Sequence, residues 1–262
     1  MRTRRIVLIA VAAVVATAAV TGCSAISYYS QAIVGHLSVM ERASPVVKYL
    51  ADPATPETLR ARLKIATEIR EFATRELALP DNPSFRRYAD LGRPYVIWNV
   101  VSAAEFSVRP LESCFPVAGC VAYRGFYSED AANAYGKTLA REGHDAFVYG
   151  VPAYSTLGWF SDPLLNTFIN YPDAELARLI FHELTHQVVY IKDDTPFNES
   201  FAVAVEEEGV RRWLDARGSD ADRSSYALSQ SRRKQFVDLV LRYQGVLDTL
   251  YKRDIDPRSK RV

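Results

Sequence analysis

Apolar and charged residues alternate with the period of an α-helix in the first part of the chain. The clearest stretch is 56–77, where charged residues separate five apolar ones: Leu59, Leu63, Ile65, Ile69 and Phe72. This spacing predicts a long amphipathic helix. Another helix is expected over 24–42, and the Pro, Asp and Asn residues of 79–84 predict a loop.

The middle of the chain changes to short runs of β-branched and aromatic residues. Such runs predict strands over 95–101, 121–126 and 145–151. The stretch AYSTLGWF, 153–160, has the composition of a further extended segment, which Asp162-Pro163 ends.

Helical spacing interrupts these strands over 131–142 and returns from Asp173 onward. Three helices are expected there, over 173–190, 198–217 and 225–252. Helices, then a small sheet, then helices predict an α+β fold.

The composition is that of a globular protein, because 48% of the 262 residues are hydrophobic and 24% are charged. The formal net charge is only +1, so the basic surface typical of nucleic-acid binding is not expected. We therefore predict no nucleic-acid partner. After a targeting segment is removed, the length suits one large domain, which we place at 23–262 with an N-terminal helical part at 24–78 and the main part at 90–262.

The N-terminus has the pattern of a secretory signal. Three arginines precede an apolar or small-residue run over 6–20, which is short for a membrane-spanning helix of roughly 20 residues. The following Val-Thr-Gly-Cys, 20–23, looks like a bacterial lipobox, in which Cys23 is lipidated and residues 1–22 are removed. A plain secretory signal is the alternative.

Lipidation of Cys23 would make the membrane a partner of this chain. By resemblance to lipoprotein sorting in Gram-negative bacteria, Ser24 in place of Asp indicates the outer membrane. We expect a lipid-anchored protein of the cell envelope that faces the periplasm.

Two further cysteines, Cys114 and Cys120, lie in the segment CFPVAGC. In an oxidising compartment a pair at this short spacing can close a small loop. Zinc binding is the alternative, but one pair with no nearby His makes a poor structural zinc site. We predict a disulfide that stabilises a loop and takes no part in the chemistry.

The strongest chemical signal is HELTH at 182–186, an HExxH motif. On a helix, His182 and His186 lie on one face, so both can bind one zinc ion at about 2.0–2.1 Å. Glu183 points elsewhere around the helix and can take a proton from a zinc-activated water. Glu183 is the single charged residue of 179–191, which predicts a buried helix whose polar groups need a partner.

A third ligand is expected from the next predicted helix. Its first residues, NESFA at 198–202, resemble the NEGFA motif of gluzincin aminopeptidases, whose Glu binds zinc; the resemblance makes Glu199 the third ligand. Glu206 is the alternative, because its distance from His186 is close to that in thermolysin-like enzymes. Seven residues are about two helical turns, so helical phase does not decide between the two. If Glu199 is the ligand, Glu206 is expected to orient a ligating His.

The segment ahead of the HExxH motif is expected to bind substrate. In zincins an edge strand in this place runs along the cleft and pairs with the substrate backbone. The expected strand here consists of Tyr154, Ser155, Thr156, Leu157 and Gly158. A glycine would let another backbone approach closely, and an ordinary buried strand and turn is the alternative.

Four segments extend the resemblance over nearly all of the mature chain: YRGF at 123–126, AYSTLGWFSDPLLNT at 153–167, FHELTHQVVY at 181–190 and FNESFAVAVEEEGVRRWL at 197–214. They resemble a family of bacterial lipoprotein aminopeptidases among the HExxH gluzincins. The resemblance implies a zincin-like fold, zinc bound by His182, His186 and Glu199, and Glu183 as catalytic acid and base.

Two features depart from the best-known zinc aminopeptidases. The GAMEN motif that binds the substrate α-amine there is absent, so endopeptidase action stays open. Relatives also continue beyond the final RDIDPRSKRV, where a Tyr or His that stabilises the oxyanion would be expected. Tyr226 and Tyr243 are weak candidates for this role, because their positions are more typical of helix packing.

The sequence therefore predicts a membrane-anchored zinc peptidase that uses one Zn²⁺ ion to hydrolyse peptides in the cell envelope. A second hypothesis is a non-catalytic envelope protein that keeps the zincin fold as a binding or assembly scaffold. A third is a metal hydrolase that acts on something other than peptides.

Overall fold

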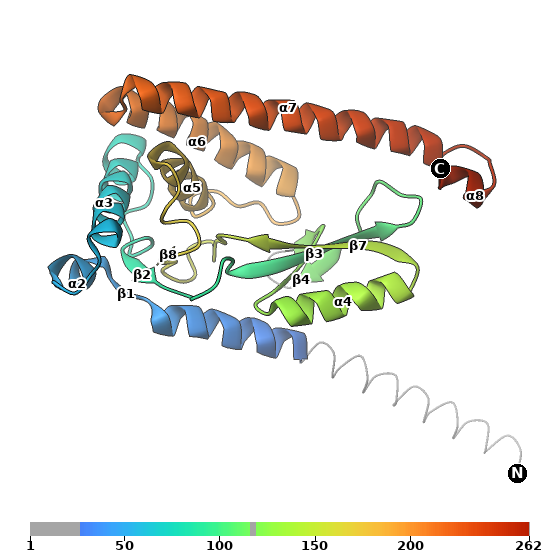
Figure 1. Ribbon diagram of the computed structural model, residues 1–262, viewed down its shortest axis with the longest axis horizontal. Coiled ribbons are helices and arrows are strands. Elements are labelled where there is room, and N and C mark those ends of the chain that lie inside the picture. Colours follow the sequence, from blue (N-terminus) through green and yellow to red (C-terminus); the bar gives the residue numbers. More distant parts are fainter. Residues whose placement is uncertain (1–26, 116–118, 262) are drawn as a thin grey trace, which may run out of the picture. The chain divides into compact units, whose positions relative to one another are not determined.

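The computed structural model describes residues 27–115 and 119–261 (Figure 1). The predicted signal peptide, Cys23 and Ser24 lie outside these residues. Contacts divide the chain into two units, Met1–Glu41 and Arg42–Val262. In the first unit the described chain is helical from residue 27, in agreement with the helix expected over 24–42.

The helical start of the second unit packs on the helices that follow the sheets. After the short α2 (Val46–Ala51), α3 (Glu57–Leu77) confirms the helix predicted over 56–77. Phe72 of α3 packs edge-on against Trp213, with ring centroids 5.3 Å apart, and lies 6.1 Å from Phe181. These rings join α3 to α5 (Asp173–Thr185) and α6 (Thr195–Arg217).

The described strands form three small sheets. One is mixed and has the order β1 (Ser44–Pro45), β2 (Arg87–Ala89), β8 (Leu164–Leu165). A second is antiparallel and has the order β6 (Arg124–Phe126), β3 (Ile97–Ala104), β7 (His144–Val151). The third is the hairpin of β4 (Ser113–Phe115) and β5 (Gly119–Val121).

The antiparallel sheet confirms two of the predicted strands. β3 and β7 pair along their whole length, from Ile97 opposite Val151 to Ala104 opposite His144. The single strand predicted over 121–126 is wrong, because β5 and β6 belong to different sheets. α4 (Glu129–Arg141) covers one face of this sheet (Figure 1), close to the helix expected over 131–142.

The extended strand predicted over 153–160 is also wrong. Residues 153–156 are irregular and a turn follows, in which Leu157 and Gly158 both have positive φ, 55° and 81°. The buried Asp162 carboxylate accepts the Thr156 N–H at 3.0 Å and the Thr156 hydroxyl at 2.8 Å. Because Asp162 accepts the Thr156 N–H, this N–H cannot pair with a neighbouring strand, and the segment forms a loop. The edges of the antiparallel sheet are β6 and β7 instead.

Close packing of α5 and α6 forms the centre of the second unit. α5 buries eight residues, among them Phe181 and Leu184, which confirms the predicted buried helix. α6 approaches closely at Gly209, where a Cβ would lie 2.7 Å from both Leu77 Cδ1 and Phe181 Cδ2. A glycine at this position is therefore required by packing.

The C-terminal helices lie at the surface of the second unit. α7 (Asp220–Tyr251) begins with a capping box at Ser219 and Asp222, and none of its residues, all of which the structure describes, is buried. The short α8 (Pro257–Lys260) follows. Among the described residues, no helix is both long enough and apolar enough to cross a membrane.

Gly209→Ala is expected to lower the free energy of unfolding by about 1–3 kcal/mol, since the added methyl overpacks the contact with Phe181. Gly245→Ala in α7 is the matched control, because a Cβ there meets nothing within 4 Å; relief of the glycine penalty should raise stability by roughly 0.5–1 kcal/mol. Urea denaturation of both variants measures the difference. Equal changes in the two variants would contradict the packing role of Gly209.

Candidate metal centre

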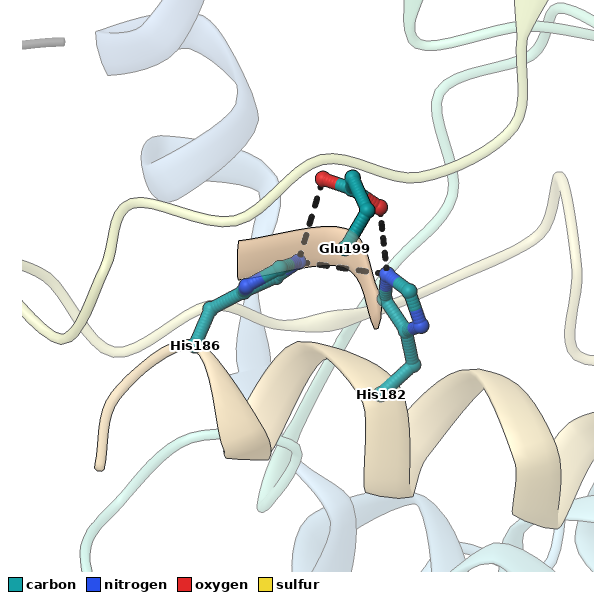
Figure 2. Close-up of side chains that lie close together, drawn as sticks. All are labelled: His182, His186 and Glu199. Carbon is teal, nitrogen blue, oxygen red and sulfur yellow. Dashed lines mark hydrogen bonds and ion pairs between the residues drawn. The ribbon is translucent and has the colours of Figure 1, made fainter. Parts of the chain in front are cut away.

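His182 lies in the last turn of the buried α5 and His186 is the C-cap residue of that helix, still in helical conformation, so the four-residue spacing directs both imidazoles to one side (Figure 2). Their Nε2 atoms are 3.1 Å apart. His186 is nearly buried, and its Nδ1 has no hydrogen-bond partner within the described structure. The helix therefore presents two ring nitrogens at a single point.

Glu199, in the second turn of α6, reaches the same point from the other side. Its Oε2 lies 3.3 Å from His182 Nε2, and its Oε1 lies 3.7 Å from His186 Nε2. Figure 2 shows the carboxylate over both imidazoles. The Glu199 side chain is 54% exposed, against 16% for His182 and 9% for His186, so the centre is open to solvent on the side of Glu199.

The spacing of these three groups fits a metal ion. One ligand atom from each of His182, His186 and Glu199 lies within 4.8 Å of the others. Tetrahedral ligands at bond lengths of about 2.1 Å are roughly 3.4 Å apart, which is close to the separations observed. Two imidazoles and one carboxylate are also a donor set that transition metals bind.

The electrostatics of the three groups reflect how closely they approach. Burial alone would lower the pKa of His182, but its hydrogen bonds with Glu199 and Glu206 raise that pKa to about 10. Burial and the neighbouring His182 lower the pKa of His186. The hydrogen bond from His182 lowers the pKa of Glu199.

Glu206 lies behind His182 rather than beside the shared point. Its buried carboxylate accepts the Nδ1–H of His182 at 2.8 Å. Because Nδ1 donates to Glu206, Nε2 is the ring nitrogen available to a metal ion at the point that it shares with Glu199 and His186. The structure thus places Glu199 with the two imidazoles and Glu206 on the opposite ring nitrogen of one of them.

Arg178 balances the buried charge of Glu206. Its Nη1 donates to both Glu206 oxygens, at 3.2 and 3.3 Å, and its Nε donates to Glu175 at 2.8 Å. Glu175 in turn accepts from Ser229 and Arg233 of α7. Sequence reasoning missed Arg178, although its place one helical turn before His182 is a signal that could have found it.

Glu183 neighbours the centre on α5. Burial is the main cause that raises the pKa of its carboxyl to about 7; His182 opposes the rise, and the carboxylates of Asp162, Glu199 and Glu206 add to it. Asp162 closes the 156–162 loop through Thr156. The charge of this loop residue therefore acts on the Glu183 carboxyl. Burial also raises the pKa of Asp162, to about 6.

The five residues predicted to bind substrate, Tyr154–Gly158, form the start of this loop and the irregular segment just before it. The loop passes the C-terminal end of α5, where a Cβ at Gly158 would lie 3.6 Å from Gln187 Cβ. Gln187 is fixed by a 2.7 Å hydrogen bond from Asn82. The segment therefore lies near the HExxH helix although it is not a strand.

Asn198, the residue before Glu199, holds the start of α6 in place. Its buried side chain accepts the N–H of Ile191 and donates to the carbonyl of Ile191, both at 2.7 Å. Asp194 caps the same helix by accepting the N–H of Phe197 at 3.1 Å. The Asn of the NESFA motif thus fixes the turn on which Glu199 stands.

Tyr123 lies in the YRGF segment, and both Glu199 and Glu183 raise the pKa of its hydroxyl. Tyr123 is 42% exposed, yet loss of hydration around its hydroxyl is the main cause that raises this pKa to about 12, with contributions from Tyr149, Glu199, Tyr190 and Glu183. The two tyrosines considered from the sequence lie elsewhere: Tyr226 interacts with Gln230 and Glu206, and Tyr243 is 58% exposed on α7.

The structure joins Cys114 and Cys120 by a disulfide across the β4–β5 hairpin. The hairpin contacts the α5–α6 connection, because the N–H of Cys120 donates to Asp193 Oδ1 at 3.0 Å.

The family comparison covers every element described above. The sequence model of the family described as "Putative aminopeptidase" matches residues 27–262. No curated protein and no solved structure matches the chain. Since the match spans nearly the whole chain, including α5, α6 and their ligand-bearing turns, the chain belongs to the Putative aminopeptidase family.

Proposed function

We propose that this chain is a zinc-dependent peptidase with His182, His186 and Glu199 as the zinc ligands. The observation that carries the proposal is the convergence of these three side chains at separations of 3.1 to 3.7 Å, with Glu183 next to them on the same helix. Membership of an aminopeptidase family supports peptide bonds as the target. Two His and one Glu on two successive helices are typical of catalytic zinc sites.

A zinc ion, when bound, lowers the pKa of water and polarises the carbonyl that is attacked. The protein must then keep the ligands oriented and handle the protons. Glu206 does the first by holding His182 through its Nδ1–H, so that Nε2 remains a lone-pair donor. Arg178 donates to both oxygens of the buried Glu206 and so holds that carboxylate in place.

Glu183 handles the protons in this proposal. Its carboxylate takes a proton from the attacking water as the water oxygen bonds to the carbonyl carbon, and it gives that proton to the leaving amine nitrogen as the C–N bond breaks. Its place beside His182 supports this role, because the adjacent residue on a helix points about 100° away and does not compete for the metal.

Tyr123 is proposed to donate its hydroxyl to the negative charge that develops on the carbonyl oxygen. Its high pKa keeps the phenol protonated at neutral pH, and the influence of Glu199 and Glu183 on that pKa supports a position for Tyr123 on their side of the site. The loop residues Tyr154–Gly158 are proposed to line the substrate, since Gly158 lies beside the end of α5.

Zinc content separates the two candidate third ligands. Purified wild type should hold about one zinc per chain, and Glu199→Ala should lose it. Glu206→Ala should keep a full site at saturating zinc but bind it about 10–100-fold more weakly, because an orienting partner is lost. Elemental analysis and chelator competition measure both quantities. If only Glu206→Ala loses the ion, Glu199 is not the third ligand; no zinc in any folded form would exclude the proposal.

Glu183→Gln should abolish peptide hydrolysis, by at least about 100-fold in kcat, while zinc stays bound. The amide keeps the shape of the side chain but cannot take the proton. Glu207→Gln, the same change on an exposed residue of α6, should keep wild-type activity. Turnover of a peptide library, stopped by chelator and restored by zinc, gives the activity. Unchanged kcat in Glu183→Gln would remove its assigned role.

Tyr123→Phe should lower kcat on the order of 10²-fold with little change in KM, since the hydroxyl acts on charge that is present only in the transition state. Tyr243→Phe, on the exposed face of α7, is the control and should match wild type. Steady-state kinetics of both variants decide the matter, and a change confined to KM would assign Tyr123 to substrate binding instead.

A further inference from the structure

We infer that the β4–β5 hairpin, closed by the Cys114–Cys120 disulfide, is a positioning element of the metal centre. Through Asp193 it holds the α5–α6 connection that places Glu199. The inference takes Glu199 as a ligand and so rests on the proposed function, but it concerns residues remote in sequence that have no place in the reaction itself.

The hairpin and the connection fit together without space for a side chain. The N–H of Cys120 donates to Asp193 Oδ1 at 3.0 Å. The preceding residue is Gly119, with φ of +76°, and a Cβ there would lie 2.2 Å from the same oxygen and 3.1 Å from the Asp193 backbone nitrogen. Only a glycine lets the hairpin approach Asp193 this closely.

Asp193 is itself held in a conformation that few residues adopt. Its φ is 64°, in the left-handed region that is uncommon for residues other than glycine. The turn around it is closed by the N–H of Asp194, which donates to the carbonyl of Ile191 at 3.3 Å. The hydrogen bond from Cys120 stabilises this turn from outside.

The turn at Asp193 is connected directly to the residue before Glu199. Asn198 clamps Ile191 by two hydrogen bonds, and Asp194 caps α6. Ile191, Asp194 and Asn198 therefore belong to the same hydrogen-bonded turn as Asp193. Because Glu199 is half exposed and follows Asn198, its position depends on this turn more than on packing of its own side chain.

The disulfide explains how so small a hairpin can act as a support. Each strand has three residues, and an isolated two-stranded hairpin is marginally stable in water. Cys114 and Cys120 are directly opposite in the register, so their bond keeps the two strands paired and the N–H of Cys120 directed at Asp193.

Zinc affinity of the full chain tests the inference, with Gly119→Ala and Asp193→Ala as the variants. Both should weaken zinc binding about 10-fold or more in chelator competition and still take up about one zinc per chain at saturation. The double variant Cys114→Ser, Cys120→Ser should shift in the same direction. Asp193→Asn should restore binding close to wild type, because its amide oxygen can still accept the Cys120 N–H.

Gly143→Ala is the matched control. Gly143 also has positive φ, +86°, but a Cβ there meets nothing within 4 Å, so the backbone strain is similar and the contact is missing. This variant should bind zinc as wild type does. Wild-type affinity in folded Gly119→Ala and Asp193→Ala would overturn the inference while leaving the proposed function intact.

Hydrogen exchange in metal-free protein separates the two proposals. Gly119→Ala and Asp193→Ala should speed amide exchange over 191–199, and Gly143→Ala should not. If wild type takes up no zinc but exchange over 191–199 still responds, the proposed function fails and the support by the hairpin stands. If exchange is unchanged in both variants, the support is refuted whether or not zinc binds.

Discussion

The hydrogen bond from His182 Nδ1 to Glu206 is the contact on which the arrangement of the centre depends. An imidazole on a helix can rotate about its side-chain torsions, and this bond fixes one orientation and one tautomer. The buried Glu206 carboxylate is paired with Arg178, and Glu175 links Arg178 to α7. The charges behind the two histidines thus form one connected group, and removing Arg178 would leave the buried Glu206 carboxylate without its arginine partner.

Local spacing was enough to predict the parts of the centre that lie on single helices. HExxH predicted that His182 and His186 share a face, because four residues are close to one helical turn, and the low charge of 179–191 predicted its burial. The order of elements also predicted the α+β class, and apolar periodicity found α3, α5 and α6. In each case the residues that determine the structure lie within one or two turns of one another.

Contacts between distant residues account for what the sequence did not reveal. The 153–160 segment has the composition of a strand, but Asp162 binds the Thr156 N–H and hydroxyl and folds it into a loop. The 121–126 run is divided because Tyr123 stands between strands of two different sheets. Arg178 and Asp193 carry no motif, and their roles depend on Glu206 and Cys120, which reach them only after folding.

The short connection between α5 and α6 also has an entropic consequence. Glu199 follows His186 by 13 residues, and Glu206 follows His182 by 24. The entropic cost of closing a loop grows with the logarithm of loop length, by about 0.6 kcal/mol for each doubling, so gathering these groups costs less than joining segments far apart in the sequence. The pair of helices α5 and α6 can therefore bring the ligands together locally, before the distant strands have paired. The contact of the β4–β5 hairpin with Asp193 then stabilises the arrangement that the two helices have formed.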